Sequence, residues 1–227
     1  MRRRGKRRGE MMRYRLDLKA DECLMLTPSG AYHAACTEQP ERVRRLLFLL
    51  MEAERAPGAQ PADIESWAAR LEMTAEDVIG LLYSLQSLKF IEALAPPLFA
   101  PRGPLEKMLP PLLNLLSSSG RALLSDRQGL YIANVGFAHE TAEELSALGA
   151  DLAALHARHR YLVNRNLGLR AEAWGLLGAD GGSRIGFWSL RIGETEFNLV
   201  IADVPYLNRS AFRDLVWALS CRYGKER

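Results

Sequence analysis

A cluster of prolines near the middle of the chain constrains the fold more than any other feature. Residues 96–104 hold four of the eleven prolines among the 227 residues. Proline fixes φ and lacks an N–H donor, so it continues neither a helix nor a central strand, and closely spaced prolines keep a segment extended. We therefore expect a Pro-rich linker at 96–104, between one domain at 13–95 and another at 105–227.

Charge is distributed unevenly along the chain. Residues 1–20 carry nine Lys or Arg and two Asp or Glu, whereas residues 21–100 carry six and twelve. We expect a basic disordered tail at 1–12, so the net charge of +3 says little about the partners of the folded part. No apolar run approaches the roughly 18 residues of a membrane span. Three cysteines without C-x-x-C spacing suggest no disulfide framework, so we expect a cytoplasmic protein.

Helical patterns dominate residues 41–94. Apolar residues recur at helical spacing from Val43 to Met51, from Ile64 to Leu71 and from Val78 to Leu88, and a short strand is expected at 90–94. Thr74, three residues before Asp77, resembles a capping box. Before these helices, residues 13–36 are expected to form one or two short strands and a turn. Residues 67–85 resemble the helix-turn-helix of winged-helix domains, with 85–91 running into the wing.

This resemblance raises the possibility of a DNA-binding protein. The residues that would face DNA are Thr74, Ala75, Glu76, Gly80, Tyr83 and Ser84. DNA readers usually present Arg, Lys, Asn or Gln at these positions, and cations that neutralise phosphates supply much of the affinity. Because Glu76 and Asp77 would face phosphates instead, we expect this domain to bind protein. A dimeric transcription regulator stays the alternative.

Residues 105–227 show a different order of elements. Patterns indicate a helix at 105–119, a hairpin at 122–136, a long leucine-striped helix at 139–164, three strands at 171–204 and a helix at about 209–222. This order predicts an α+β domain with a five-stranded antiparallel sheet and flanking helices. It resembles the roadblock (dynein-light-chain-like) family, and the hairpin, the long helix and the strand with Phe187 and Trp188 carry the resemblance. Longin and profilin-like domains share much of the order.

The roadblock resemblance implies a homodimer, formed by pairing of the strand after the long helix and by packing of the two long helices. The interface residues would be Ala142, Ser146, Gly149, Ala153, Ala157, Trp174 and Leu176. A track of small residues permits two helices to approach closely, but it equally permits one helix to cross its own sheet closely. We favour the dimer interface.

The same resemblance implies a partner protein, because bacterial members of the family often bind and regulate a Ras-like small GTPase. Trp174 and Trp188 are the aromatic side chains expected to anchor such a partner, and packing on a face of the sheet is the other explanation for both.

No sequence motif predicts catalysis, a metal site or a cofactor. The chain has no phosphate-binding Gly-rich loop, no nucleophile elbow and no H-E-x-x-H. His156 and His159 have a spacing that could share a metal, but no third ligand is evident. We therefore expect a non-catalytic adaptor without a cofactor. A small ligand held only by backbone groups would leave no motif in the sequence.

Overall fold

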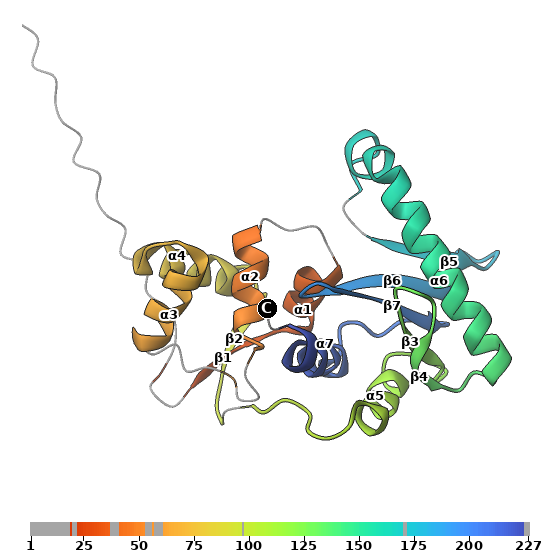
Figure 1. The fold of residues 1–227 in the computed structure, drawn as a ribbon, viewed down its shortest axis with the longest axis horizontal. Helices are drawn as coiled ribbons and strands as arrows, with labels where there is room; N and C mark the ends of the chain where they lie inside the picture. Colours follow the sequence, from red (N-terminus) through yellow and green to blue (C-terminus); the bar gives the residue numbers. More distant parts are fainter. Residues whose placement is uncertain are drawn as a thin grey trace, which may run out of the picture.

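A computed structural model gives the fold, and its described residues are 19, 22–36, 41–52, 56, 61–96, 98–169 and 172–224. The expected tail at 1–12 lies outside these residues, as does Pro97 of the expected linker. The helices α3 (Pro61–Leu71) and α4 (Ala75–Ser87) lie at one end of the molecule, and the long helix α6 (His139–Arg160) lies at the other (Figure 1).

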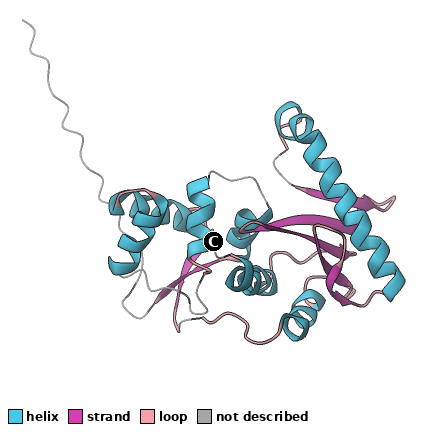
Figure 2. Ribbon diagram, in the orientation of Figure 1, coloured by secondary structure: helices cyan, strands magenta, loops and turns pink. Residues whose placement is uncertain are grey.

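Five strands form one antiparallel sheet in the C-terminal half, as predicted. They are β3 (Ala122–Asp126), β4 (Tyr131–Val135), β5 (Ala173–Leu177), β6 (Ser183–Ile192) and β7 (Thr195–Ala202). Their order across the sheet is β4-β3-β7-β6-β5, so β4 and β5 are the edge strands. Figure 2 shows this sheet with helices on both of its faces, which confirms the α+β class.

The two faces of the sheet are covered by different helices. Helix α6 (His139–Arg160), which continues into the π-helix η1 (Tyr161–Asn166), packs on one face, whereas α5 (Leu105–Asn114) and α7 (Ser210–Tyr223) pack on the other. Side chains alternate between faces along a strand. Phe187 accordingly joins the cluster under α6, and Trp188 joins the core under α7.

The N-terminal half is mainly helical. Its elements are β1 (Cys23–Leu26), α1 (Pro28–Cys36), α2 (Glu41–Leu49), α3 (Pro61–Leu71), α4 (Ala75–Ser87) and β2 (Ile91–Leu94). The predicted cap of α4 is present, since the Asp77 N–H donates to Oγ1 of Thr74 at 3.1 Å. The expected pattern of three helices followed by a strand is therefore correct.

The turn predicted around residues 27–30 is wrong, because helix α1 begins there. The Thr27 hydroxyl accepts a hydrogen bond from the Gly30 N–H at 3.0 Å, and Pro28 occupies the first helical position. Thr-Pro-Ser-Gly contains turn-forming residues, but Thr is also a good N-cap and Pro suits the first turn of a helix. Tertiary packing selects the helix, since five residues of α1 are buried.

The predicted winged helix is only partly visible in the structure. Helices α3 and α4 follow each other across a short turn, as in a helix-turn-helix. Strand β2 pairs with β1, which precedes all the helices, and in the described part of the chain it pairs with no following strand. The wing, and with it the winged-helix assignment, stays a prediction.

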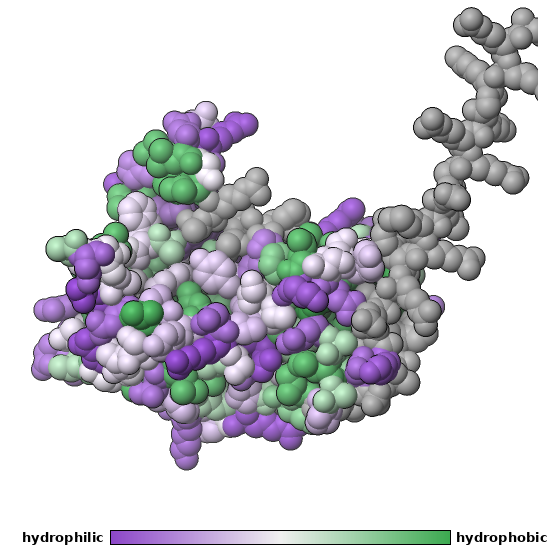
Figure 3. Space-filling model, turned by 180° about the vertical axis from the view of Figure 1, so that it is seen from behind, coloured by the Kyte–Doolittle hydropathy of each residue, from purple (hydrophilic) through white to green (hydrophobic). Residues whose placement is uncertain are grey.

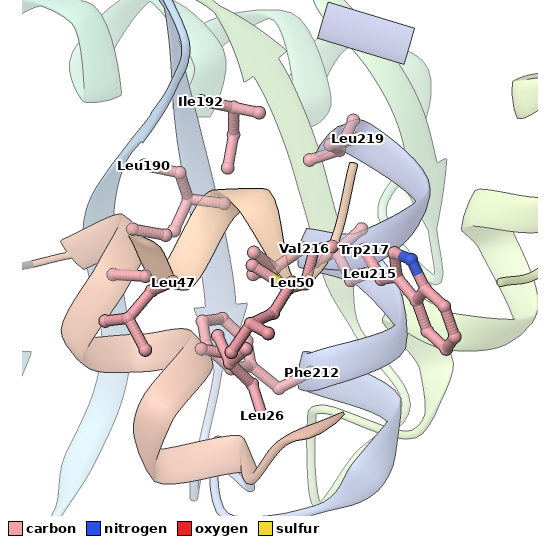
Figure 4. Close-up of a cluster of buried hydrophobic side chains, with 14 of the residues drawn as sticks. Leu26, Leu47, Leu50, Leu190, Ile192, Phe212, Leu215, Val216, Trp217 and Leu219 are labelled. Atoms are coloured by element: carbon pink, nitrogen blue, oxygen red, sulfur yellow. The ribbon is translucent and has the colours of Figure 1, made fainter. Parts of the chain in front are cut away.

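One hydrophobic core extends through both halves of the chain. Figure 4 shows Leu26 and Leu47 of the N-terminal half beside Leu190, Phe212 and Leu215 of the C-terminal half. Helix α1 lies against α7 and β6. The domain boundary expected at 96–104 stays a prediction. Apolar packing joins the parts of the chain before and after it.

Gly30 lies where helix α1 comes closest to another backbone segment of the N-terminal half. A Cβ atom at Gly30 would lie 1.9 Å from the carbonyl oxygen of Phe90, which belongs to the segment between α4 and β2. Only glycine lets α1 approach this backbone, so the residue determines how α1 sits on the strand pair.

We predict that Gly30→Ala lowers the free energy of unfolding by about 2–4 kcal/mol, because backbone rather than a flexible side chain must move. Urea denaturation followed by circular dichroism measures the change. Gly182→Ala is the control, since its Cβ would meet only an exposed side chain, with the Asp180 Oδ1 at 3.3 Å. Equal stability of the two variants would contradict the close approach of α1 to the Phe90 backbone at Gly30.

A candidate protein interface at the open edge of the sheet

Strand β5 is an edge strand that exposes apolar side chains. Leu176 is 59% exposed, Leu177 is 69% exposed and Trp174 is 36% exposed. Edge strands of soluble proteins are usually short, charged or covered, because an open apolar edge invites another strand. This edge is short, but within 173–177 it carries no charge.

The hydrogen-bonding pattern of β5 shows which of its backbone N–H and C=O groups face the open edge. The Ser189 N–H donates to the Glu172 carbonyl at 3.3 Å, so these two residues form a hydrogen-bonded pair. Such pairs alternate along an antiparallel ladder. Trp174 and Leu176 therefore bond to β6, whereas the N–H and C=O groups of Ala173 and Gly175 face outward.

The end of α6 and the π-helix η1 extend the exposed apolar surface. Exposed large hydrophobic residues cluster in this segment, and they are Tyr161, Leu162, Leu167 and Leu169. Figure 3 shows hydrophobic surface on the projecting end of this segment, and Figure 1 shows that the end lies beyond the body of the sheet. We name these four residues, together with Trp174, Leu176 and Leu177, the edge surface.

The small residues of α6 fall into two groups in the structure. Ala142, Ser146 and Gly149 are buried against the chain's own sheet, so they are not available to a second copy. The Cβ of a residue at 149 would lie 3.3 Å from Asn198 Cβ. The alternative explanation, a close crossing of the helix over its own sheet, therefore holds for these three residues. Ala153 and Ala157 are less buried and line a cavity under the helix.

Trp188 is a core residue, which fits the other explanation given for it, packing on a face of the sheet. It is only 9% exposed, and its indole hydrogen-bonds to the side chain of Tyr32 in α1. Gly186 leaves the space that the Trp188 ring fills, because a Cβ there would lie 2.2 Å from the ring. Burial raises the pKa of Tyr32 to about 12, which keeps this phenol neutral in the core.

Trp174 lies where the sequence placed it, on the edge strand. Its indole N–H donates to Nδ1 of His156 in α6 at 3.2 Å, and the two rings meet edge to face. This contact holds the indole against the helix while part of the ring stays exposed. Trp174 thus joins the edge strand to the long helix.

The expected DNA-facing residues lie on the outer side of α4. Thr74, Ala75, Glu76, Tyr83 and Ser84 are exposed, and Gly80 is half-buried. The Thr74 hydroxyl caps the helix, and the Ser84 hydroxyl donates to the Gly80 carbonyl at 2.8 Å. Glu76 and Asp77 form the acidic first turn, which is poorly suited to a phosphate backbone.

Two acidic residues beside the strands of the sheet have structural explanations. Oδ1 of Asp126 accepts hydrogen bonds from the Gln128 and Leu130 N–H groups at 2.8 and 3.0 Å, so it stabilises the β3–β4 turn. Hydrogen bonds to Ser119 and Arg121 hold the pKa of Asp203 below its ordinary value. Among the described residues no group of three metal-ligating side chains is present, and no helix is long and apolar enough to cross a membrane.

Comparisons with solved structures find similarity over about half of the chain. The roadblock/LC7 domain from Streptomyces avermitilis is 14% identical, with 53% of this chain and 93% of that chain covered and a TM-score of 0.34. MglB of Myxococcus xanthus is 16% identical, with 51% and 91% covered and a TM-score of 0.34. The gliding protein mglB from Thermus thermophilus is 20% identical, with 55% and 91% covered and a TM-score of 0.31. No family model and no curated protein matches the chain. At TM-scores of 0.31 to 0.34 these likenesses establish no function for this chain.

We predict that Gly149→Leu lowers the free energy of unfolding by about 1–3 kcal/mol, because the side chain must displace Asn198 and Phe187 beneath the helix. Leucine favours helix over glycine, so any loss reports on packing rather than helix propensity. Ala147→Leu on the exposed side of α6 is the control. Unchanged stability of Gly149→Leu in thermal denaturation would show that α6 does not press on the sheet at this point.

Proposed function

We propose that this protein is a non-catalytic adaptor that forms a homodimer through the edge surface and binds a partner protein. The observation that carries the proposal is the open strand β5, whose side chains and outward backbone groups are both available. Covering this edge with a second copy removes apolar area from water and supplies partners for the backbone of Ala173 and Gly175.

The proposed homodimer has a two-fold axis beside the middle of β5. Antiparallel pairing of β5 with its copy would join the two five-stranded sheets into one continuous sheet. Such an interface is isologous, so each residue of the edge surface meets the same surface on the other chain. The projecting end of α6 and η1 would then pack near the copy's edge strand, which accounts for its exposed apolar residues.

The partner that we propose is a Ras-like small GTPase. The order of hairpin, long helix, three strands and helix, which resembles the roadblock family, supports this class of partner. The acidic first turn of α4 argues against DNA as the main partner, although a dimeric regulator with two helix-turn-helix units is the competing proposal.

We predict that the full chain sediments at twice its 25.4 kDa mass at micromolar concentration and that Leu176→Glu sediments as a monomer. In an isologous interface the new carboxylate faces the same region of its copy, so two buried like charges oppose the dimer. Sedimentation equilibrium measures the mass.

Leu130→Glu is the matched control, because Leu130 is 64% exposed beside β4, at the opposite edge of the sheet. It should leave the dimer intact. A wild-type monomer at tens of micromolar, or a dimer that survives Leu176→Glu, contradicts the proposed interface.

We further predict that the immobilised full chain retains a small GTPase from nuclease-treated lysate of its source cell in one nucleotide state only. Parallel captures with GDP and with a non-hydrolysable GTP analogue, followed by mass spectrometry, make the measurement. Retention in neither state contradicts this class of partner. Sub-micromolar, salt-sensitive binding to a defined DNA duplex would favour the competing proposal.

A further inference from the structure

A cavity of about 150 Å³ lies between α6 and the strands β6 and β7. The helix contributes mostly alanines to its wall, and they are Ala150, Ala153, Ala154 and Ala157. The sheet contributes polar residues, among them Ser189 and Asn198, where the neighbouring part of the same face carries Phe187 and Val200. Small side chains above and polar side chains below leave a space that apolar packing does not fill.

The hydrogen-bonding state of His156 at this cavity follows from its neighbour. An indole N–H only donates, so Nδ1 of His156 must accept the hydrogen bond from Trp174. The imidazole then carries its proton on Nε2. His156 is 5% exposed, and its buried Nε2 atom has no hydrogen-bond partner. The cavity wall thus holds a buried donor that lacks an acceptor.

Two further residues of the cavity wall also have a buried polar atom without a hydrogen-bond partner. Nε of Arg160 is buried without an acceptor, and Oε1 of Glu172, a residue only 9% exposed, is buried without a donor. Buried polar atoms in folded proteins nearly always have hydrogen-bond partners. Three unpartnered atoms at one cavity therefore indicate that a hydrogen-bonding group is missing from it. The missing group must accept from His156 and Arg160 and donate to Glu172.

The charges around the cavity favour an anion. Arg191 lies 3.7 Å from Glu172 and 3.6 Å from Glu196, and Arg127 lies 3.6 Å from Glu196. In the described part of the chain Arg160 makes no ion pair. The wall therefore has three arginines against two carboxylates, beside a neutral histidine, and one positive charge is left over.

We propose that this cavity binds a phosphate group. Its oxygens accept from His156 and Arg160, and the hydroxyl of monohydrogen phosphate donates to Oε1 of Glu172. The volume corresponds to about five water molecules, which suits free phosphate. The site goes beyond the adaptor role and does not rest on it, because every lining residue comes from one chain.

Isothermal titration calorimetry of the full chain with inorganic phosphate, in phosphate-free buffer at neutral pH, tests the proposal. We expect saturable binding at one site per chain. Sulfate should bind at least about tenfold more weakly, because it has no proton for Glu172 and leaves that carboxylate facing an oxygen. Methyl phosphate, which is mainly a dianion without a P–OH proton at neutral pH, should likewise bind more weakly than inorganic phosphate.

Arg160→Gln should weaken phosphate binding at least about tenfold, because it removes the unpaired charge and a charge-assisted hydrogen bond. Arg158→Gln, an exposed arginine of the same helical turn, is the matched control and should bind like the wild type. Ala153→Leu fills the cavity from the helix and should abolish binding, with thermal denaturation checking that each variant is folded.

Three results overturn the proposal. They are the absence of saturable phosphate binding to the folded wild type, equal affinities for phosphate and sulfate, and equal losses in Arg160→Gln and Arg158→Gln. Absence of binding would mean that water molecules satisfy the three buried atoms. Either of the other two results would mean that the anion binds without the contacts to Glu172 and Arg160.

Discussion

Apolar packing around α7 is the interaction on which the rest of the structure depends. Phe212, Leu215, Val216, Trp217 and Leu219 are fully buried, so the helix is apolar on most of its circumference. A helix of this kind is stable only when neighbours cover it from several directions. The sheet, α5 and α1 provide that cover, and α1 belongs to the N-terminal half. Because α7 needs both halves, this face of the sheet is closed, and the free surfaces lie at α6 and β5.

The other face of the sheet is shaped by the small residues of α6. Near its start, Ser146 and Gly149 bring the helix onto Leu123, Phe187 and Val200. Farther along, alanines face polar strand residues and leave the cavity that contains His156. Trp174 connects this cavity to the edge surface, since its ring contacts His156 while belonging to β5. The proposed interface and the proposed phosphate site are therefore neighbours that share one aromatic contact.

Much of the candidate site could be predicted from the sequence, but not the face on which each residue lies. Trp174 and Leu176 were expected on the strand after the long helix, and they lie there. For Trp188 both an interface and the core on a sheet face were expected, and it is buried under α1. The sequence left this open because alternation along a strand separates two faces without telling which is covered. The orphaned atoms of His156, Arg160 and Glu172 carry no sequence signal, since they come together only when α6 crosses the sheet.

The sequence by itself determined the order and type of most elements. Hydrophobic periodicity and turn residues are local properties, and they specify the three N-terminal helices, the hairpin, the long helix and the closing meander. The tertiary structure alone decided that residues 28–36 form a helix and that β1 pairs with β2. It also decided that α1 closes the core of the other half. These outcomes depend on contacts between residues far apart in the chain, such as Gly30 against Phe90, whose free energy no local pattern contains.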